Sequence, residues 1–283
     1  MSREMRHRAG DIGRATLVHV TLGGYCLLVL APILLVLLNS FKTRQGIFDA
    51  PLGLPDAATF SLAGYHRVLG NSAVLQMFAN SAIVTGVSLV LILLFGAMAA
   101  WALTEYGFRG NRLVALFLAF GIMVPIRLGS VSILQTMVAL NLVNTLTALV
   151  LVYVAQGLPL AILILSEFIR QVPGELKDAA RCDGVSEYTI FLRIILPLVR
   201  PAVATVGVFT MVPIWNDLWF PLILAPSEGT QTLTLGVQQF IGQFATDWNA
   251  VLAALSLAVL PVLVVYALLS RQLIRGITAG AVK

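Results

Sequence analysis

The 283-residue sequence contains few residues that could perform chemistry, and they form no catalytic set. Its three histidines are His7, His19 and His66, and no histidine–carboxylate or serine–histidine set is present. The two cysteines, Cys26 and Cys182, lack the Cys-x-x-Cys spacing of a redox or zinc site. The sequence therefore predicts a chain that is not an enzyme and holds no metal.

The sequence also lacks the residues that hold ATP. A phosphate-binding P-loop needs Gly-Lys-Ser/Thr to hold phosphates and magnesium. The only lysines, Lys42, Lys177 and Lys283, follow Phe, Leu and Val. We therefore expect no cofactor in this chain, and any ATP-driven process would take its energy from another subunit.

Charged side chains are concentrated in one stretch, Val172–Pro197. Only 11% of the chain is charged, yet seven charged residues lie within nineteen positions here: Glu175, Lys177, Asp178, Arg181, Asp183, Glu187 and Arg193. Local signals predict two short helices joined by a bend. The first, at about Glu175–Cys182, should stop at Gly184 in a left-handed conformation, and Ser186 should cap the second.

Each of these short helices is expected to carry an apolar face. In the first, Leu176, Ala179 and Ala180 share a face at i, i+3 and i+4, and the alanines would let another protein approach closely. Pro197 and Pro201 should end the second helix, whose apolar stripe consists of Tyr188, Phe191, Leu192 and Ile195. An ordinary loop on the bilayer surface would explain the stripe but not the small-residue face and bend, which favour a docking surface.

Long apolar segments surround this stretch and must position it. Hydrophobic residues make up 59% of the chain, above the roughly 45–50% of soluble domains. Uncharged runs of about twenty residues can each cross a hydrocarbon core about 30 Å thick. Pro125 should kink or break the third run, and Gly96, Ala97, Ala99 and Ala100 in the second favour close helix packing. We expect an all-α membrane protein with six transmembrane helices, at about residues 15–38, 79–103, 113–137, 147–165, 201–224 and 250–270.

The distribution of lysine and arginine predicts the orientation of these spans. With the N-terminus inside, 14 of the 18 basic residues lie on inner segments, as the positive-inside rule requires. This places the N-terminal segment 1–14, the loop 172–200 and the tail 272–283 in the cytoplasm, around a membrane domain of residues 15–271. Membrane orientation also accounts for the net charge of +5. No nucleic-acid partner is expected, because no basic cluster is interleaved with aromatic residues.

The spacing of residues in the charged stretch matches a known motif. Asp178-Ala179-Ala180 is followed after three residues by Gly184, and after nine more by Ile194-Ile195-Leu196-Pro197. This pattern resembles the EAA loop of binding-protein-dependent ABC importer permeases. The one departure is Asp178 where Glu is usual, which keeps the charge. The motif is specific, because it constrains several positions over twenty residues.

The resemblance extends over nearly the whole chain and is weakest at Met1–Arg14 and in the first outer loop. Further segments are similar to the carbohydrate-uptake branch, and within it to the smaller, six-span permease of maltose-type systems. These segments are Trp215-Asn216-Asp217, Thr234-Leu235-Gly236, Asp247-Trp248 and the C-terminal run Arg275–Lys283. The resemblance implies the ABC importer type I permease fold.

In that family the short helix of the EAA loop sits in a groove on a cytoplasmic ATPase and passes nucleotide-driven closure to the membrane helices. The resemblance implies the same role here for Leu176, Asp178, Ala179, Ala180, Gly184, Ile194, Leu196 and Pro197. The tail, at Thr278, Gly280 and Lys283, is a second candidate contact with the ATPase, with a disordered tail as the alternative.

The resemblance also implies partners. These are a second homologous permease, two ATPase subunits that bind ATP and magnesium, an extracytoplasmic solute-binding protein, membrane lipid and a sugar substrate. Gln239, Asp247 and Trp248 lie in the outer loop where this family meets the solute-binding protein, although an ordinary solvated loop would also explain them.

Polar residues within the apolar spans suggest a second site. A carboxylate at mid-membrane costs about 2.5–3.5 kcal/mol on insertion scales, so Asp217 should face a cavity or a partner. Trp215, Asn216 and Asp217, which with Pro213 interrupt the fifth span, could line the sugar pathway. They could instead serve a structural role at a helix break, which we favour because the triplet is typical of the whole branch. Arg127 could line the route or extend to the outer interface.

Two other functions are compatible with parts of the sequence. A permease of the same superfamily could carry a polyol or glycerol phosphate instead of a sugar. An ion-coupled secondary transporter would need buried titratable residues in several spans and commonly has inverted repeats. The sequence offers one such carboxylate, Asp217, and no evident repeat.

Overall fold

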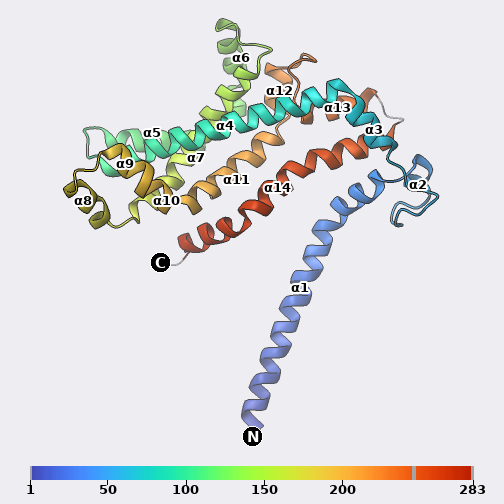
Figure 1. Cartoon of the computed structure of the whole chain (residues 1–283), viewed down its shortest axis with the longest axis horizontal. Coiled ribbons are helices and arrows are strands. Elements are labelled where there is room, and N and C mark those ends of the chain that lie inside the picture. The colour runs from blue at the N-terminus through green and yellow to red at the C-terminus, as the bar shows by residue number, and fades with distance from the viewer. Residues whose placement is uncertain (1, 244–246, 282–283) are drawn as a thin grey trace. The chain divides into compact units, whose positions relative to one another are not determined.

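A computed structural model describes residues 2–243 and 247–281, with side chains described for residues 16–238 and 247–270. The described chain contains helices (Figure 1), and it has one isolated β-bridge, between Lys42 and Phe60. In chain order the elements are α1 Ser2–Ser40, α2 Arg44–Asp49, α3 Ala63–Gly70, α4 Ser72–Glu105, α5 Asn111–Met123, the 3-10 helix η1 Ile126–Gly129, α6 Ser130–Ala139, α7 Leu146–Arg170, α8 Gly174–Cys182, α9 Glu187–Ile190, the π-helix η2 Phe191–Ile195, α10 Leu196–Leu198, α11 Arg200–Trp215, α12 Trp219–Leu224, α13 Leu233–Gln243 and α14 Trp248–Ala281.

Four helices in the described residues are long and apolar enough to cross a membrane. They are Thr16–Ser40 within α1, α4, α7 and Trp248–Ser270 within α14. Two bent helix pairs raise the number to six if each is one span. One pair joins Asn111–Met123 to Ile126–Ala139 at 87°, and the other joins Glu187–Leu198 to Arg200–Trp215 at 75°. The prediction of an all-α membrane protein is confirmed, while the side of each terminus stays a prediction.

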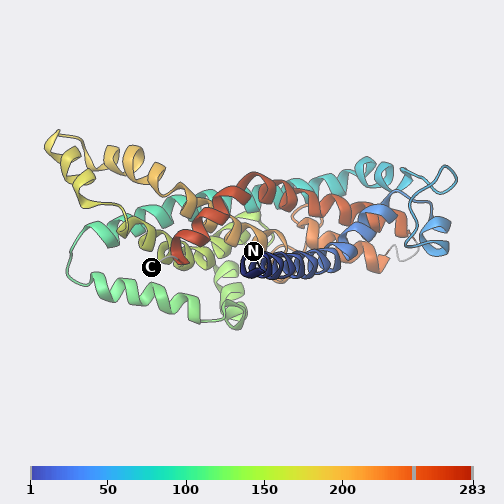
Figure 2. The same cartoon turned by 90° about the horizontal axis from the view of Figure 1, so that it is seen from below.

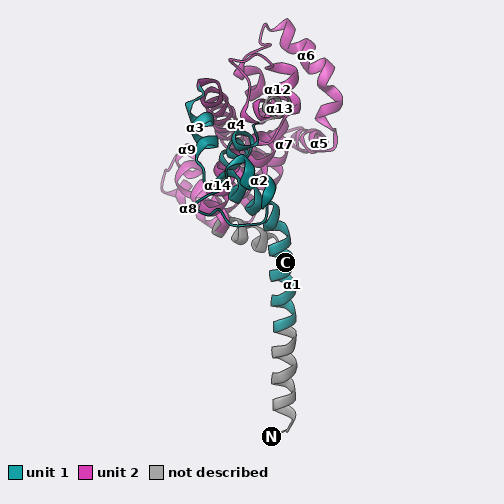
Figure 3. Cartoon of the chain, turned by 90° about the vertical axis from the view of Figure 1, so that its right-hand side faces the viewer, with its two compact units in different colours: residues 1–71, 240–257 teal, residues 72–239, 258–283 magenta. Residues whose placement is uncertain are grey.

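The chain divides into two compact units, coloured separately in Figure 3. Unit 1 comprises residues 1–71 and 240–257, and unit 2 comprises residues 72–239 and 258–283. Unit 1 holds α1 to α3 and the first turns of α14. Unit 2 holds α4 to α12, most of α13 and the rest of α14, and it includes the charged stretch.

The core of unit 2 forms where α4 packs along α7. Gly96 of α4 lies against Ala161 of α7, and a Cβ atom on Gly96 would be 2.9 Å from the Ala161 Cβ atom. Ala97 and Ala100 are also buried. Small side chains let two helix backbones approach closely, which is how apolar helices associate in lipid. The predicted small-residue surface of the second span is therefore where α4 contacts its neighbour.

The predicted breaks in the apolar spans fall at Pro125 and after Trp215. The chain turns sharply after α5, at Pro125, as predicted (Figure 2). In the fifth span, α11 continues through Pro213 to Trp215 and α12 begins at Trp219, so the predicted interruption is confirmed at Asn216-Asp217 and is wrong at Pro213. The second outer loop also contains α13, which the loop prediction missed.

The close approach of α4 and α7 can be tested by adding a side chain. Replacing Gly96 with leucine should destabilise unit 2 by about 1–3 kcal/mol, because the Ala161 Cβ atom occupies the space required. We expect the detergent-solubilised Gly96→Leu protein to unfold several degrees below the natural protein. Gly86→Leu is the matched control, since nothing lies within 4 Å of a Cβ atom at that exposed position of α4. Equal Tm values for the two variants would contradict the packing described.

Candidate functional site

The charged stretch folds into two short helical segments separated by a bend at Gly184. α8 ends at Cys182, and Gly184 has a φ of 73°, in the left-handed region that favours glycine. The Val185 N–H donates to the Ala180 carbonyl, and the Gly184 N–H donates to the Arg181 carbonyl, each at 3.0 Å. This pair of bonds is the Schellman motif, which satisfies the last carbonyls of a helix. The bend predicted from Gly184 is confirmed.

The second segment begins at Ser186 and continues further than predicted. The Ser186 hydroxyl accepts a hydrogen bond from the Thr189 N–H, as expected of a cap. The helix then runs through Pro197 and ends at Leu198, between the two prolines that were predicted to end it. The π-helix Phe191–Ile195 precedes this proline, and its wider turns accommodate a residue that cannot donate a helical hydrogen bond. Pro201 instead lies in the first turn of α11, where a missing N–H costs nothing.

A cluster of ion pairs fastens α8 to unit 2. Glu105, the last residue of α4, accepts hydrogen bonds from Lys177 Nζ at 2.6 Å and from an Arg181 terminal nitrogen at 2.5 Å. Arg181 Nε also donates to Glu187 at 2.7 Å. The Glu105 side chain is only 9% exposed, so this contact is largely shielded from water. One arginine thus connects the end of α4, the helix α8 and the start of α9.

Two aromatic residues complete this cluster. The Tyr106 hydroxyl donates to Glu187 at 3.2 Å, and Lys177 Nζ lies 5.7 Å from the centre of the Trp101 ring. Hydrogen bonds to Glu187 and Glu105 raise the pKa of Arg181, so this side chain stays charged at any physiological pH. Burial, followed by the hydrogen bond to Glu187, raises the pKa of Tyr106 and keeps its hydroxyl a donor. Sequence analysis did not select Glu105 or Tyr106, because neither lies within the motif.

The structure separates the residues predicted to share a face of α8. Ala180 is 8% exposed and packs into the core of unit 2, whereas Leu176 is 46% exposed and Asp178 and Ala179 also face outward. Only Leu176 and Ala179 of the predicted face of α8 are therefore accessible to another protein. Ala180 follows Lys177 by three residues, so it lies next to the side of α8 that the ion pairs hold inward.

The predicted stripe on the second segment divides in the same way. Phe191 and Ile195 are buried, while Tyr188 is 79% exposed and Leu192 also faces outward. The π-helix offsets the spacing that would align them in a regular α-helix. The three remaining motif residues, Ile194, Leu196 and Pro197, are half-buried where this segment approaches α11. Leu176, Asp178, Ala179, Tyr188 and Leu192 together form an outward surface, which we call the docking face.

The residues predicted for the pathway point in different directions. Trp215 is buried, and its Nε1 donates to the Ala258 carbonyl at 3.0 Å. The Asn216 amide donates to the Val212 carbonyl. Asp217 accepts from the Tyr153 hydroxyl at 2.9 Å and from the Phe220 N–H at 3.1 Å, so it stabilises the start of α12. These contacts support a role at a helix break.

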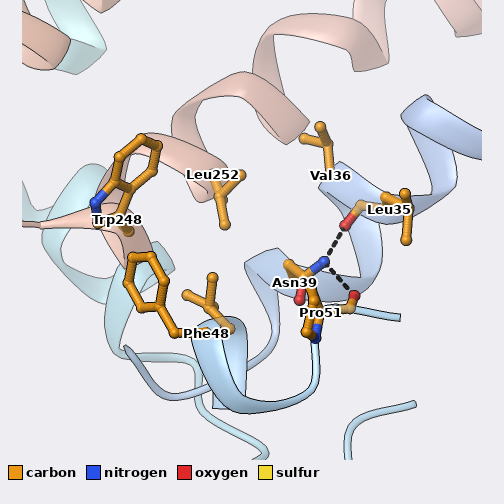
Figure 4. A pocket seen from close by; sticks show the side chains of 8 residues that line it. Leu35, Val36, Asn39, Phe48, Pro51, Trp248 and Leu252 are labelled. Carbon is orange, nitrogen blue, oxygen red and sulfur yellow. Dashed lines mark hydrogen bonds between the residues drawn. The ribbon is translucent and has the colours of Figure 1, made fainter. Parts of the chain in front are cut away.

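The outer-loop and tail predictions fall partly outside the described side chains. Asp247 forms an ion pair with Arg67, and the Trp248 ring meets Phe48 edge to face. Trp248 also borders a pocket of about 390 Å³ in unit 1 (Figure 4), lined by Leu35, Val36, Asn39, Ile47, Phe48, Pro51, Trp248 and Leu252. Gln239 lies in α13, and Thr278 and Gly280 lie in α14, but their side chains are outside the described ones. Lys283 lies outside the described residues.

The chain is similar in sequence to known transport proteins. Residues 92–279 match the family described as binding-protein-dependent transport system inner membrane component. The chain is 34% identical to a putative ABC transporter permease of Caldicellulosiruptor sp. (strain Rt8B.4), over 93% of this chain and 95% of that protein. It is 31% identical to the diacetylchitobiose uptake system permease of Streptomyces coelicolor, over 94% and 88%. It is 33% identical to the melibiose/raffinose/stachyose import permease of Bacillus subtilis, over 89% and 91%.

A solved structure shares the fold. It is a bacterial ABC transporter involved in the import of the acidic polysaccharide alginate, with a TM-score of 0.79 and 22% sequence identity. The superposition covers 96% of this chain and 98% of that one. A second structure, of a bacterial alginate ABC transporter in complex with an alginate pentasaccharide-bound periplasmic protein, matches with a TM-score of 0.65 at 15% identity.

The ion-pair cluster predicts that the stability of α8 depends on Glu105. Glu105→Ala would leave Lys177 and Arg181 without their shared, shielded acceptor. Hydrogen bonds to charged groups contribute about 1.5–3 kcal/mol, so amide exchange in α8 should accelerate roughly tenfold to a hundredfold. Hydrogen–deuterium exchange on the purified protein would measure this.

Glu167→Ala is the matched control, because Glu167 pairs with Arg170 on an exposed surface. Exchange in α8 should not change in that variant. If Glu105→Ala also left the exchange of α8 unchanged, the cluster would not be what holds this helix.

Proposed function

We propose that this chain, which belongs to the family of inner membrane components of binding-protein-dependent transport systems, is a permease subunit of an ATP-driven sugar importer. The chain is a multi-pass inner-membrane protein. The observation that carries the sugar assignment is similarity along the full length. Relatives at 31% and 33% identity, aligned over 94% and 89% of this chain, are named for uptake of sugars.

A second, similar permease would complete the translocation pathway. The support for this partner comes from α5, which contacts α7 on one side but buries none of its own residues. Leu113, Phe117 and Met123 of α5 are all exposed. An apolar helix left uncovered along one side can be covered by lipid or by another membrane subunit, and a pathway for a polar solute needs protein around it.

Two ATPase subunits would supply the energy and would bind ATP and magnesium, since this chain has no P-loop. We propose that the docking face contacts one of them from the cytoplasm. Its residues are exposed, and Asp178 among them pairs with Arg181 at 3.1 Å, while Arg181 also fastens α8 to Glu105 and Glu187. A displacement of α8 would therefore reach α4 through Glu105 and α11 through the second segment.

An extracytoplasmic solute-binding protein would deliver the sugar to the opposite side. Asp247 and Trp248 remain the candidate contacts, and Trp248 offers an aromatic ring beside Phe48. Transport would then proceed by alternating access. ATP-driven closure of the ATPases would draw the coupling helices together and open the pathway outward, and hydrolysis would reset it.

Blocking the docking face should prevent the permease from coupling to the ATPase subunits. Ala179→Trp would place a large ring where the ATPase surface must approach closely, and overpacking of about 1–3 kcal/mol would weaken docking roughly tenfold or more. We expect sugar uptake and solute-stimulated ATP hydrolysis to fall together in proteoliposomes holding the complete transporter.

The matched control is Leu163→Trp, which adds the same ring on an exposed position of α7 and should retain uptake. Normal uptake by Ala179→Trp would show that this face does not dock. Sugar uptake that persists in proteoliposomes lacking the ATPase subunits would instead favour an ion-coupled transporter.

A further inference from the structure

A second pocket lies in unit 2, where the third span breaks against α7. The helix α5 ends at Met123, and the chain turns by 87° at Pro125. The turn and the middle of α7 enclose a pocket of about 520 Å³. Its volume falls within the roughly 300–1,000 Å³ of small-molecule sites. Arg127 and Gln156 are the longest polar side chains that line it.

Gln156 is a polar residue within an apolar helix. It lies near the middle of α7, a 25-residue apolar helix that spans Leu146–Arg170. Its side chain is exposed, and it takes part in none of the hydrogen bonds found among the described residues. An amide with no hydrogen-bond partner in an apolar medium costs several kcal/mol. Gln156 therefore requires water, a polar ligand or a polar partner chain in front of it.

The backbone carbonyl of Ala155 is a hydrogen-bond acceptor on the same helix. Pro159 has no N–H, so it cannot donate the usual helical hydrogen bond to the carbonyl of Ala155, and both residues line the pocket. Pro159 also contacts Gly121 of α5, where an added Cβ atom would lie 3.0 Å from the proline ring. This close contact between α5 and α7 is part of the lining of the pocket.

Arg127 brings hydrogen-bond donors to the pocket with its charge balanced. Its guanidinium is 3.4 Å from Asp217, whose side chain is 8% exposed, while that of Arg127 is 67% exposed. Asp217 also accepts from Tyr153, which lies one turn before Gln156 on α7. The arginine therefore has an ion-pair partner in this unit, and most of its N–H groups remain free to bind a ligand.

We propose that this pocket is a solute-contact site of the translocation pathway, where Gln156 and Arg127 hydrogen-bond the hydroxyl groups of a neutral sugar. A carboxamide both donates and accepts, as a hydroxyl does, so the two groups are complementary. Asp217 opposes the charge of Arg127, which favours a neutral ligand over an acidic one. This proposal rests on the proposed function and adds the residues through which the chain contacts its solute.

The test is the accessibility of position 156 to a water-soluble reagent. Cys26 and Cys182 are first replaced by serine, and Gln156→Cys is introduced into the complete transporter in proteoliposomes. A charged methanethiosulfonate reagent should modify this cysteine in at least one nucleotide state, and saturating sugar should slow the modification. Leu151→Cys is the matched control, because Leu151 is exposed on a different side of α7 and should not react.

A transport measurement with Gln156→Leu and Gln156→Asn accompanies the labelling. Gln156→Leu should raise the KM for sugar about threefold to tenfold, as expected for loss of one neutral hydrogen bond. Gln156→Asn, which keeps the carboxamide, should restore part of that loss.

Two labelling results would overturn the proposed site. A cysteine at 156 that reacts in no nucleotide state would show that the residue faces lipid or a partner chain, and would overturn it. Modification that sugar does not slow would overturn the solute contact. Uptake by the cysteine-free parent distinguishes failure of the proposed function from failure of the proposed site. If the parent shows no ATP-driven sugar uptake, the proposed function fails, whereas parent uptake with an inert position 156 overturns only this site.

Discussion

The position of α8 depends on one arginine held between two carboxylates. Arg181 joins Glu105 at the end of α4 to Glu187 at the start of α9. A helix of nine residues has little stability of its own, and Ala180 is the only residue of α8 that is buried. Apolar packing is therefore too small to fix this helix. The carboxylate of Glu105 is shielded from water, so moving α8 away would leave that charge unpaired. The ion pairs therefore hold α8 in place, as a hydrophobic face holds a longer helix.

Around that anchor, the chain changes direction by local devices that differ in kind. Gly184 makes the bend after α8 by adopting a left-handed conformation. The π-helix before Pro197 widens the second segment, and the bend before α11 turns the chain by 75°. None of these devices needs a long-range contact to form. The ion pairs then fix the position of α8 and the second segment against the end of α4. Local geometry therefore makes the bends, and tertiary electrostatics positions the bent segment.

This separation explains which features could be predicted from the sequence. The apolar helical character of the chain, the break at Pro125, the glycine bend and the Ser186 cap depend on neighbouring residues, and each was predicted correctly. The partnership of Glu105 with Lys177 and Arg181 joins residues 72 and 76 positions apart, which no local pattern can indicate. The inward placement of Ala180 follows from that partnership, so no local pattern could indicate that only Leu176 and Ala179 of the predicted face are exposed. Gln156 was not considered, because one amide in an apolar run does not alter its periodicity.

The uncovered side of α5 has a consequence for the life of the chain in a cell. Leu113, Phe117 and Met123 have no protein neighbour in the described chain along that side, while α7 covers the other. A newly inserted copy therefore exposes this side of α5 to lipid. If a second permease covers it, as proposed above, copies made in excess of that partner would keep the surface exposed. The number of incompletely covered copies would then depend on how much of the partner the cell synthesises.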